Sequence, residues 1–301
     1  MIPEFPRFKP LQLEDREVMG KMIWEYQPRT SEWTFTNLFI WRSHYGFHCS
    51  RYGDWVLVLS TADPRGSFFL QPIGPPSQIE AVRKCLQWLK EERGEKNPRI
   101  ERADAKLAGE IPDAPDLVVE PTRDHFDYLY KSQDLIQLAG RKYHGKRNHI
   151  NRFLQSHTFS YSPLEKPHLS ECLRLGGFWC EIRRCDEDLN LMGEWEAVRE
   201  ALTHFFELKI QGGVLLLEGK VEAFSLGEML NQETAVIHVE KANPEIPGLY
   251  PLINQQFCEK NWSQVPLINR EQDLGNPGLR KAKESYFPDH LVEKFRIRPA
   301  E

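Results

Sequence analysis

The sequence lacks several features that would place a chain of 301 residues in a familiar class. No window approaches the roughly 18 to 20 apolar residues that a membrane-spanning helix requires. Residues 1–7 lack the apolar core of a secretory signal, which predicts a soluble protein in the cytoplasm. No Gly-x-Ser-x-Gly motif is present, so the commonest serine-nucleophile signature is excluded.

Cysteine is sparse and shows no paired spacing. The six cysteines are Cys49, Cys85, Cys172, Cys180, Cys185 and Cys258. Because none forms a Cys-x-x-Cys pair, we expect free thiols in a reducing compartment. Residue types that bind zinc occur at Cys172, Cys180 and Cys185, with His168 nearby, but their spacing matches no common structural zinc pattern. Buried packing thiols are the favoured interpretation, and no metal site is predicted.

An excess of positive charge is also missing, since the net charge is −5. A general nucleic-acid binder is therefore not indicated, and an anionic partner must meet a local basic patch. Residues 138–153, a predicted helix, contain such a patch, made of Arg141, Lys142, Lys146 and Arg147. The interleaved Tyr143, His144 and His149 suit phosphate contacts and stacking. Alternatively, Ile150 and Phe153 face a core and the charges are merely solvated.

The chain repeats one order of predicted elements. The first half contains strands at 55–59 and 67–70, a helix from Ser77 with a capping box to Glu80, and a strand at 99–104. The second half contains a helix at 194–208, a hairpin at 214–218 and 223–230, a strand at 234–239, a helix at 248–260 and a strand at 266–269. A duplicated α/β unit follows, with domains at 1–120 and 121–301 and a basic linking region at 121–155.

The most informative segment is residues 266–288, where a short strand leads through a polar turn into a basic helix. Polar groups crowd the exit of this strand, which is where α/β proteins usually bind ligands. The helix from Gly278 places Arg280 and Lys283 close to the turn, and Tyr286 follows one turn later. A ligand site is the predicted function. The alternative is a solvated helix in which an Asp273–Arg280 ion pair only staples the turn.

Three segments carry a resemblance to a known family, namely residues 35–42, 140–153 and 272–288. Together they resemble the C-terminal part of phosphatidylglycerol lysyltransferase, and the resemblance spans nearly the whole chain. It implies an α/β (α+β) fold of two tandem GNAT-like acyltransferase units, with mixed sheets flanked by helices. It also implies transfer of an acyl or aminoacyl group, from charged tRNA to a lipid headgroup in the lysyltransferase itself.

The resemblance also suggests roles for individual residues. Substrate binding is assigned to Arg280, Lys283, Asn269, Gln272 and Lys241. Catalysis is assigned to Asp273, Tyr286, Glu240 and His238. Asp273 would orient the nucleophile or hold Arg280, and Tyr286 would donate a proton. Glu240 and Lys241 would face the same cleft, while His238 is either a general base or a packed or surface histidine.

The donor follows from a missing motif. Acetyl-CoA users of this fold carry an Arg/Gln-x-x-Gly-x-Gly/Ala loop at a helix N-terminus, but residues 243–251 here contain Pro247 and Pro251, which supply no N–H. A donor bulkier than acetyl-CoA is therefore favoured, and the resemblance implies aminoacyl-tRNA rather than acyl-CoA, although Gly248 still leaves room for a phosphate or carboxylate. Peripheral contact with lipid headgroups is expected. An acyl-CoA-dependent N-acetyltransferase and a non-catalytic protein that binds an anionic ligand stay open as alternatives.

Overall fold

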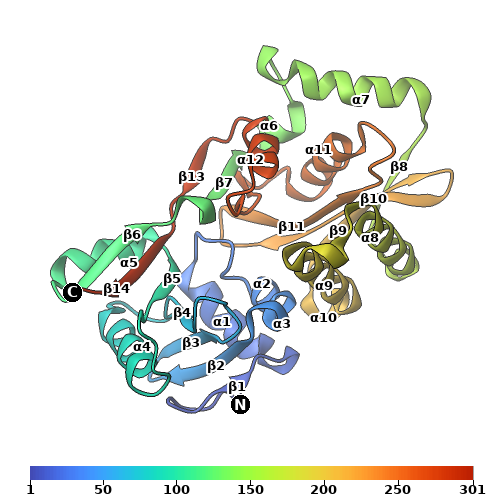
Figure 1. The fold of residues 1–301 in the computed structure, drawn as a ribbon. Coiled ribbons are helices and arrows are strands. Elements are labelled where there is room, and N and C mark those ends of the chain that lie inside the picture. Colours follow the sequence, from blue (N-terminus) through green and yellow to red (C-terminus); the bar gives the residue numbers. More distant parts are fainter. Residues whose placement is uncertain (301) are drawn as a thin grey trace. The chain divides into compact units, whose positions relative to one another are not determined.

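The computed structural model describes residues 1–300 and divides into two compact units (Figure 1). The first unit comprises Met1–Asp127, Gln272–Asn276 and the chain from Leu291 onward. The second comprises Tyr128–Glu271 and Pro277–His290. In the part of the chain that is described, no helix is both long and apolar enough to cross a bilayer.

The first unit is built on a seven-stranded mixed sheet with the order β1-β2-β3-β4-β5-β14-β6. The strands are β1 (Lys9–Pro10), β2 (Phe47–Tyr52), β3 (Trp55–Ser60), β4 (Phe68–Leu70), β5 (Ile100–Ala103), β6 (Leu117–Pro121) and β14 (Phe295–Pro299). Neighbours are antiparallel except β4 and β5, which run parallel. A parallel pair needs a crossover connection, and α4 (Ile79–Glu91) provides it.

Helix α4 confirms the predicted apolar face but not its predicted start. The buried residues of this face are Ala81, Val82, Cys85, Leu86 and Leu89. The predicted capping box between Ser77 and Glu80 is wrong, because the helix begins only at Ile79. Ser77 instead donates a hydrogen bond to Glu110. Glu80 accepts from the hydroxyl of Tyr52 on β2, so a tertiary contact replaces the local one.

The second unit repeats this topology with a sheet of order β13-β7-β12-β11-β10-β9-β8. The strands are β7 (Asp127–Lys131), β8 (Ser160–Pro163), β9 (Gln211–Leu217), β10 (Lys220–Met229), β11 (Thr234–Ala242), β12 (Leu267–Asn269) and β13 (His290–Val292). Strands β9, β10 and β11 are antiparallel, whereas β11 and β12 are parallel and joined by α11 (Leu249–Trp262). The order antiparallel hairpin, third strand, helix and parallel fourth strand thus occurs in both units, which confirms the duplicated α/β fold.

The remaining helices surround the two sheets. In the first unit they are α1 (Arg16–Tyr26), α2 (Phe35–Ile40), α3 (Arg42–Tyr45) and α5 (Ala105–Glu110). In the second unit they are α6 (Ser132–Gln137), α7 (His144–Ser156), α8 (Leu169–Arg183), α9 (Leu189–Thr203), α10 (Phe205–Leu208) and α12 (Pro277–Glu284). Short 3-10 helices lie at Leu13–Asp15, Ile111–Asp113, Arg123–His125, Arg141–Tyr143, Lys166–His168 and Cys185–Glu187. The helix predicted at 194–208 is therefore two helices and starts earlier.

The two repeats exchange their last strands, which moves the division of the chain. Strand β7 closes the first repeat in sequence but pairs with β12 in the second sheet. Strand β14 closes the second repeat but lies between β5 and β6 in the first sheet. A single cut between residues 120 and 121 cannot describe this arrangement, because the C-terminal strand returns to the first unit. The region 121–155 likewise contributes β7 and α7 to structured units rather than forming a linker.

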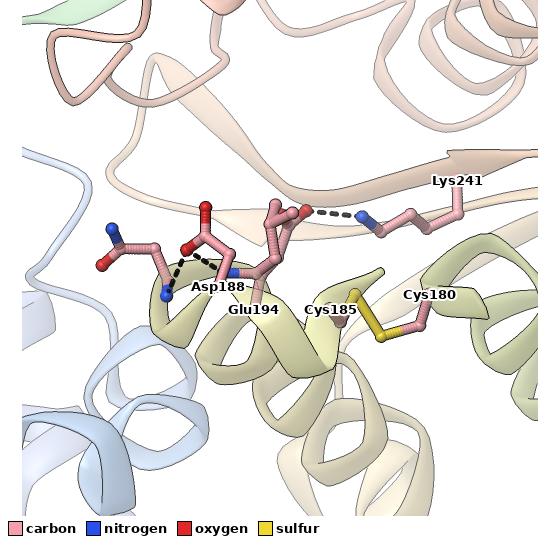
Figure 2. Close-up of a disulfide and its surroundings, with 7 residues drawn as sticks. Cys180, Cys185, Asp188, Glu194 and Lys241 are labelled. Carbon is pink, nitrogen blue, oxygen red and sulfur yellow. Dashed lines mark hydrogen bonds and ion pairs between the residues drawn. A yellow bond between two sulfur atoms is a disulfide. The ribbon is translucent and has the colours of Figure 1, made fainter. Parts of the chain in front are cut away.

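The cysteines correct one expectation. Cys180, in the last turn of α8, forms a disulfide with Cys185, which opens the next 3-10 helix (Figure 2). Arg184 between them takes a left-handed conformation that reverses the chain and brings the two Cα atoms to 5.2 Å. The other four cysteines are free and buried. Within residues 1–300, no group of three or more His, Cys, Asp or Glu side chains is arranged to hold a metal ion.

Candidate active site

One cluster of charged and aromatic side chains in the second unit joins segments that are far apart in the sequence. We call it the Arg270 cluster, and its members are Tyr130, Lys146, Glu240, Asn254, Arg270, Lys283 and Tyr286. They come from β7, α7, β11, α11, α12 and the segments that follow β12 and α12. Four of these residues were predicted as site or patch residues from the sequence.

Arg270 forms the centre of the cluster. Its Nη2 donates to Oε1 of Glu240 at 3.0 Å, and Nδ2 of Asn254 donates to Oε2 of the same carboxylate at 2.9 Å. The Arg270 and Glu240 side chains are only 14% and 12% exposed. Burial opposes the charged form, but Glu240 raises the pKa of Arg270, so the guanidinium stays charged. Nη1 of Arg270 and Oδ1 of Asn254 are buried and have no hydrogen-bond partner among the described residues.

Tyr286 connects Arg270 to the basic helix α7. The Arg270 guanidinium carbon lies 4.7 Å from the centre of the Tyr286 ring, and Lys146 Nζ lies 3.8 Å from it. Burial raises the pKa of Tyr286, so the hydroxyl remains protonated and is suited to donating a hydrogen bond rather than a proton. Tyr143 holds the Tyr286 backbone, since its hydroxyl donates to the Tyr286 carbonyl oxygen at 2.8 Å.

Lys146 differs from an ordinary surface lysine. Its side chain is partly buried, and burial, followed by the neighbouring positive charge of Arg270, lowers the pKa of Lys146 to about 8. Lys283 is fixed by backbone, because its Nζ donates to the Arg270 carbonyl oxygen while its own carbonyl accepts from Tyr130. With Arg270, these lysines bring three cationic side chains into the cluster, and Arg270 is bonded to the carboxylate of Glu240. The cluster is therefore suited to an anionic group or to a negative charge that develops during a reaction.

His238 occupies a separate position on β11. Its Nε2 lies 3.0 Å from Glu228 and its Nδ1 lies 2.9 Å from Glu271, and the side chain is 1% exposed. Burial disfavours the charged ring, but the hydrogen bonds to both carboxylates raise the pKa of His238 to about 9. At neutral pH the imidazolium donates from both nitrogens and has no lone pair for a proton. This geometry is that of a carboxylate-clamped cation rather than of a general base.

Glu240 and Lys241 do not share a cleft. They are consecutive on β11, opposite Ser225 and Phe224 of β10, so their side chains lie on opposite faces of the sheet. Lys241 Nζ contacts Glu194 of α9 at 2.5 Å (Figure 2). It also lies 3.2 Å from the centre of the Trp179 ring on α8. The predicted shared cleft is therefore wrong, because strand alternation sends Lys241 towards α8 and α9.

Three further predicted residues lie at the exit of β12. Asn269 is fully buried, and its Oδ1 accepts from the Glu271 backbone at 2.7 Å. Gln272 and Asp273 belong to the first unit, where Gln272 accepts a hydrogen bond from Lys294 at 3.2 Å. Asp273 is fully buried, accepts from the Gly275 backbone at 2.8 Å and lies 3.3 Å from Arg123. Arg280 lies on α12, partly buried.

The basic patch shows features of both interpretations. Arg141 and Lys142 are exposed in a 3-10 helix, and Arg147 donates to the carbonyl oxygens of Leu138 and Gly140. The buried residues of α7 are Ile150 and Phe153, so this helix does pack one apolar face. Its other face is cationic, since α7 contains no Asp or Glu. The patch can therefore meet phosphates without losing its packing.

Helix α7 packs against the start of α11. Gly248 is the N-cap of this helix with a φ of +98°. A Cβ placed there would lie 2.7 Å from the His149 carbonyl oxygen and 2.8 Å from Cβ of Phe153, both on α7. Glycine is therefore required here by both the backbone conformation and the close approach of α7. The expectation that Gly248 admits a phosphate or carboxylate stays a prediction.

The sequence analysis missed Arg270, Asn254 and Tyr130. Arg270 directly follows the predicted strand, and nothing in the local pattern separates it from the other polar residues of the turn. Asn254 did carry a signal, because it lies on the face of α11 that buries Ile253 and Phe257. A polar residue on such a face is expected to have a buried partner, which here is Glu240.

Comparison with known proteins agrees with this geometry. The family described as "Phosphatidylglycerol lysyltransferase, C-terminal" matches residues 25–298. The chain belongs to this family. Its fold and its family are those of acyl- and aminoacyl-transferases.

Similar solved structures support the assignment. A conserved protein of unknown function from Bacteroides thetaiotaomicron VPI-5482 is 32% identical, with all of both chains covered and a TM-score of 0.89. L-PGS from Bacillus licheniformis is 17% identical over 99% of this chain and 93% of its own, with a TM-score of 0.62. A tandem GNAT protein from the clavulanic acid biosynthesis pathway, 11% identical over 98% of each chain, has a TM-score of 0.50. The two-sheet architecture is therefore the tandem GNAT fold.

Proposed function

We propose that this protein transfers an aminoacyl group from a charged tRNA to an amine or hydroxyl acceptor, with an anionic lipid headgroup as the acceptor class. The observation that carries the proposal is the centre of the Arg270 cluster, where a buried N–H on Nη1 of Arg270 has no partner among the described residues and Lys146 lies over the neighbouring Tyr286 ring. The family resemblance supports the reaction type, since the phosphatidylglycerol lysyltransferase domain matches nearly the whole chain.

The chemistry asks for orientation and charge stabilisation. An aminoacyl ester is already activated, so its transfer needs an aligned nucleophile and donors for the oxyanion that forms on the carbonyl. Arg270 offers a buried N–H on Nη1 that is not used within the described residues, and Tyr286 keeps its hydroxyl proton. We assign the oxyanion to these two groups and the orientation of Arg270 to Glu240.

A tRNA donor fits the composition of α7. The helix contains several cations and no Asp or Glu, and Arg141 and Lys142 extend this basic face into the preceding 3-10 helix. Contacts of this kind bind phosphates independently of sequence and weaken with salt. A charged tRNA bound along α7 would bring its phosphates to the same helix that carries Lys146 into the Arg270 cluster.

The lipid acceptor is matched to α12. This helix exposes Leu279 and Lys281 beside Arg280, a combination of apolar and cationic groups that suits a membrane interface with anionic headgroups. An acyl-CoA donor is less well supported, because α7 lies against the N-terminus of α11 at Gly248.

The test is a transfer assay. The purified protein would be mixed with tRNA charged with radiolabelled amino acids and with vesicles that contain phosphatidylglycerol. We expect label in the lipid fraction. The Arg270→Met variant should transfer at least about 10-fold less label. The matched control is Lys131→Met, which removes a lysine of the same unit whose side chain is 62% exposed. No transfer from any charged tRNA to lipid or to added hydroxylamine would overturn the proposal.

A further inference from the structure

We propose that Lys146 accepts the proton of the attacking nucleophile during transfer. The inference rests on the proposed function and adds a role for one residue of the basic patch, which was expected only to bind phosphate. It is carried by the placement of the partly buried Lys146 against the ring of Tyr286, which Arg270 also contacts.

Lys146 is separated from the other cations of the patch by its surroundings. Lys142 is exposed and lies 3.6 Å from Asp134, and Arg147 is held by two carbonyl oxygens. Lys146 instead points its Nζ at the Tyr286 ring, 3.8 Å from the ring centre. It therefore reaches the site through α7 while its neighbours stay at the surface.

Burial and one neighbouring charge favour the neutral form of Lys146. Arg270, after β12, repels a second positive charge, whereas the Glu240 carboxylate on β11, already bonded by Arg270 and Asn254, favours the charged form. Tyr286, after α12, supplies a ring and a hydroxyl that remains protonated. From α11, Cys258 adds no charge, because burial raises the pKa of its thiol to about 12. The lowered pKa of Lys146, about 8, agrees with this arrangement.

The proposed step balances as follows. The acceptor X–H, where X is nitrogen or oxygen, forms a bond from X to the ester carbonyl carbon, and its proton moves to the neutral amine of Lys146. The bond between that carbon and the ribose oxygen of the tRNA then breaks. The Lys146 ammonium returns the proton to the departing ribose oxygen, which leaves Lys146 neutral for the next turnover.

A purely structural role for Lys146 predicts something else. A cation that only holds Tyr286 would be replaced adequately by arginine, and activity would follow stability at every pH. Proton transfer instead requires a group that can lose its proton near neutral pH, which arginine cannot do.

The first experiment measures the titration directly and needs no substrate. Lysines of the intact protein would be reductively methylated with ¹³C-formaldehyde, and the Lys146 signal would be assigned from its absence in Lys146→Arg. We expect this signal to titrate near pH 8, well below the ordinary lysine value of roughly 10.4. Titration of Lys146 together with the other lysines would overturn the inference even if the enzyme is active.

The second experiment compares pH–rate profiles of transfer to phosphatidylglycerol vesicles. The parent rate should rise with pH through about 8, because the neutral amine is the active form. Lys146→Arg should lose this limb and roughly 100-fold of kcat, with KM for charged tRNA unchanged, while Lys142→Gln keeps the limb. An active parent with the same limb in Lys146→Arg overturns the inference alone. A parent that transfers nothing at any pH overturns the proposed function and the step that rests on it, whatever the titration shows.

Discussion

The two units contain topologically equivalent strands, β5 and β12, but the charged clusters beside these strands differ in how far they are exposed to solvent. In the first unit, Lys294 Nζ lies 2.6 Å from Asp127 and 2.7 Å from Glu32, and Arg102 of β5 lies 3.7 Å from Glu32. We call these four residues the Lys294 cluster. Its two cations meet two carboxylates, and no member is more than 7% exposed.

The Arg270 cluster has the opposite character. It pairs Arg270 with Glu240, leaves both side chains partly exposed and places Lys146 over the neighbouring ring of Tyr286. Breaking a fully buried ion pair is strongly destabilising, whereas Arg270 keeps an N–H on Nη1 without a partner among the described residues. The duplicated fold thus contains a cluster that is buried from solvent in the first unit and a partly exposed cluster in the second unit. For this reason we place the chemistry in the second unit.

The largest expected effect tests whether the Lys294 cluster is structural. Lys294→Met removes the cation that bridges two fully buried carboxylates, and breaking such a group costs about 3–5 kcal/mol. Urea unfolding of the variant measures this loss. Lys131→Met, whose exposed partner is Asp289, should change the free energy of unfolding by less than about 0.5 kcal/mol. Equal effects of the two substitutions would remove the distinction between the clusters.

The next effect depends on pH and concerns His238. Its folded pKa of about 9 exceeds the unfolded value of roughly 6.5, so the clamp stabilises the protein fully below about pH 6.5 and loses this stabilisation as pH rises through about 9. His238→Asn should cost roughly 3 kcal/mol near pH 6 and little near pH 10. A difference between variant and parent that stays constant over this range would show that His238 titrates normally.

The disulfide gives a smaller effect on the far side of the second sheet from the Arg270 cluster. Closing the five-residue separation between Cys180 and Cys185 should contribute roughly 2 kcal/mol through the unfolded chain. A reducing agent should therefore lower the midpoint of thermal unfolding in the parent but not in Cys185→Ser. An unchanged parent midpoint after complete reduction, confirmed by thiol counting, would contradict this contribution.

Among the substitutions of buried groups, the smallest loss of stability is expected at the centre of the candidate site. Arg270→Met leaves Glu240 bonded to Asn254 and beside the positive charge of Lys146, which limits the cost to about 1–2 kcal/mol. Transfer activity should nevertheless fall by at least about 10-fold. A stability loss as large as that of Lys294→Met would indicate that the Arg270 cluster is a structural core as well.

Some features were predictable from local pattern. The hairpins of β3 with β4 and of β9 with β10, the helices α4 and α11 and the apolar face of α4 follow from turn residues and from period-2 and period-3.6 spacing, which neighbouring residues create by themselves. The segment 266–288 was also identified correctly as polar and basic. Ser77 and Glu80 show the limit of this reasoning. They do not form the predicted local capping box, because Ser77 bonds to Glu110 and Glu80 bonds to Tyr52 instead.

The sequence by itself determined the repeated α/β units, the family and the residues that crowd the exit of β12. Only the tertiary structure decided which side chains meet. Lys241 lies on the opposite face of the sheet from Glu240, and His238 lies between two carboxylates. Lys146 contacts Tyr286, which is 140 positions later in the sequence. It also exchanged β7 and β14 between the sheets. The physical reason is that pairing, burial and charge balance depend on neighbours in space, and these are far apart in the chain.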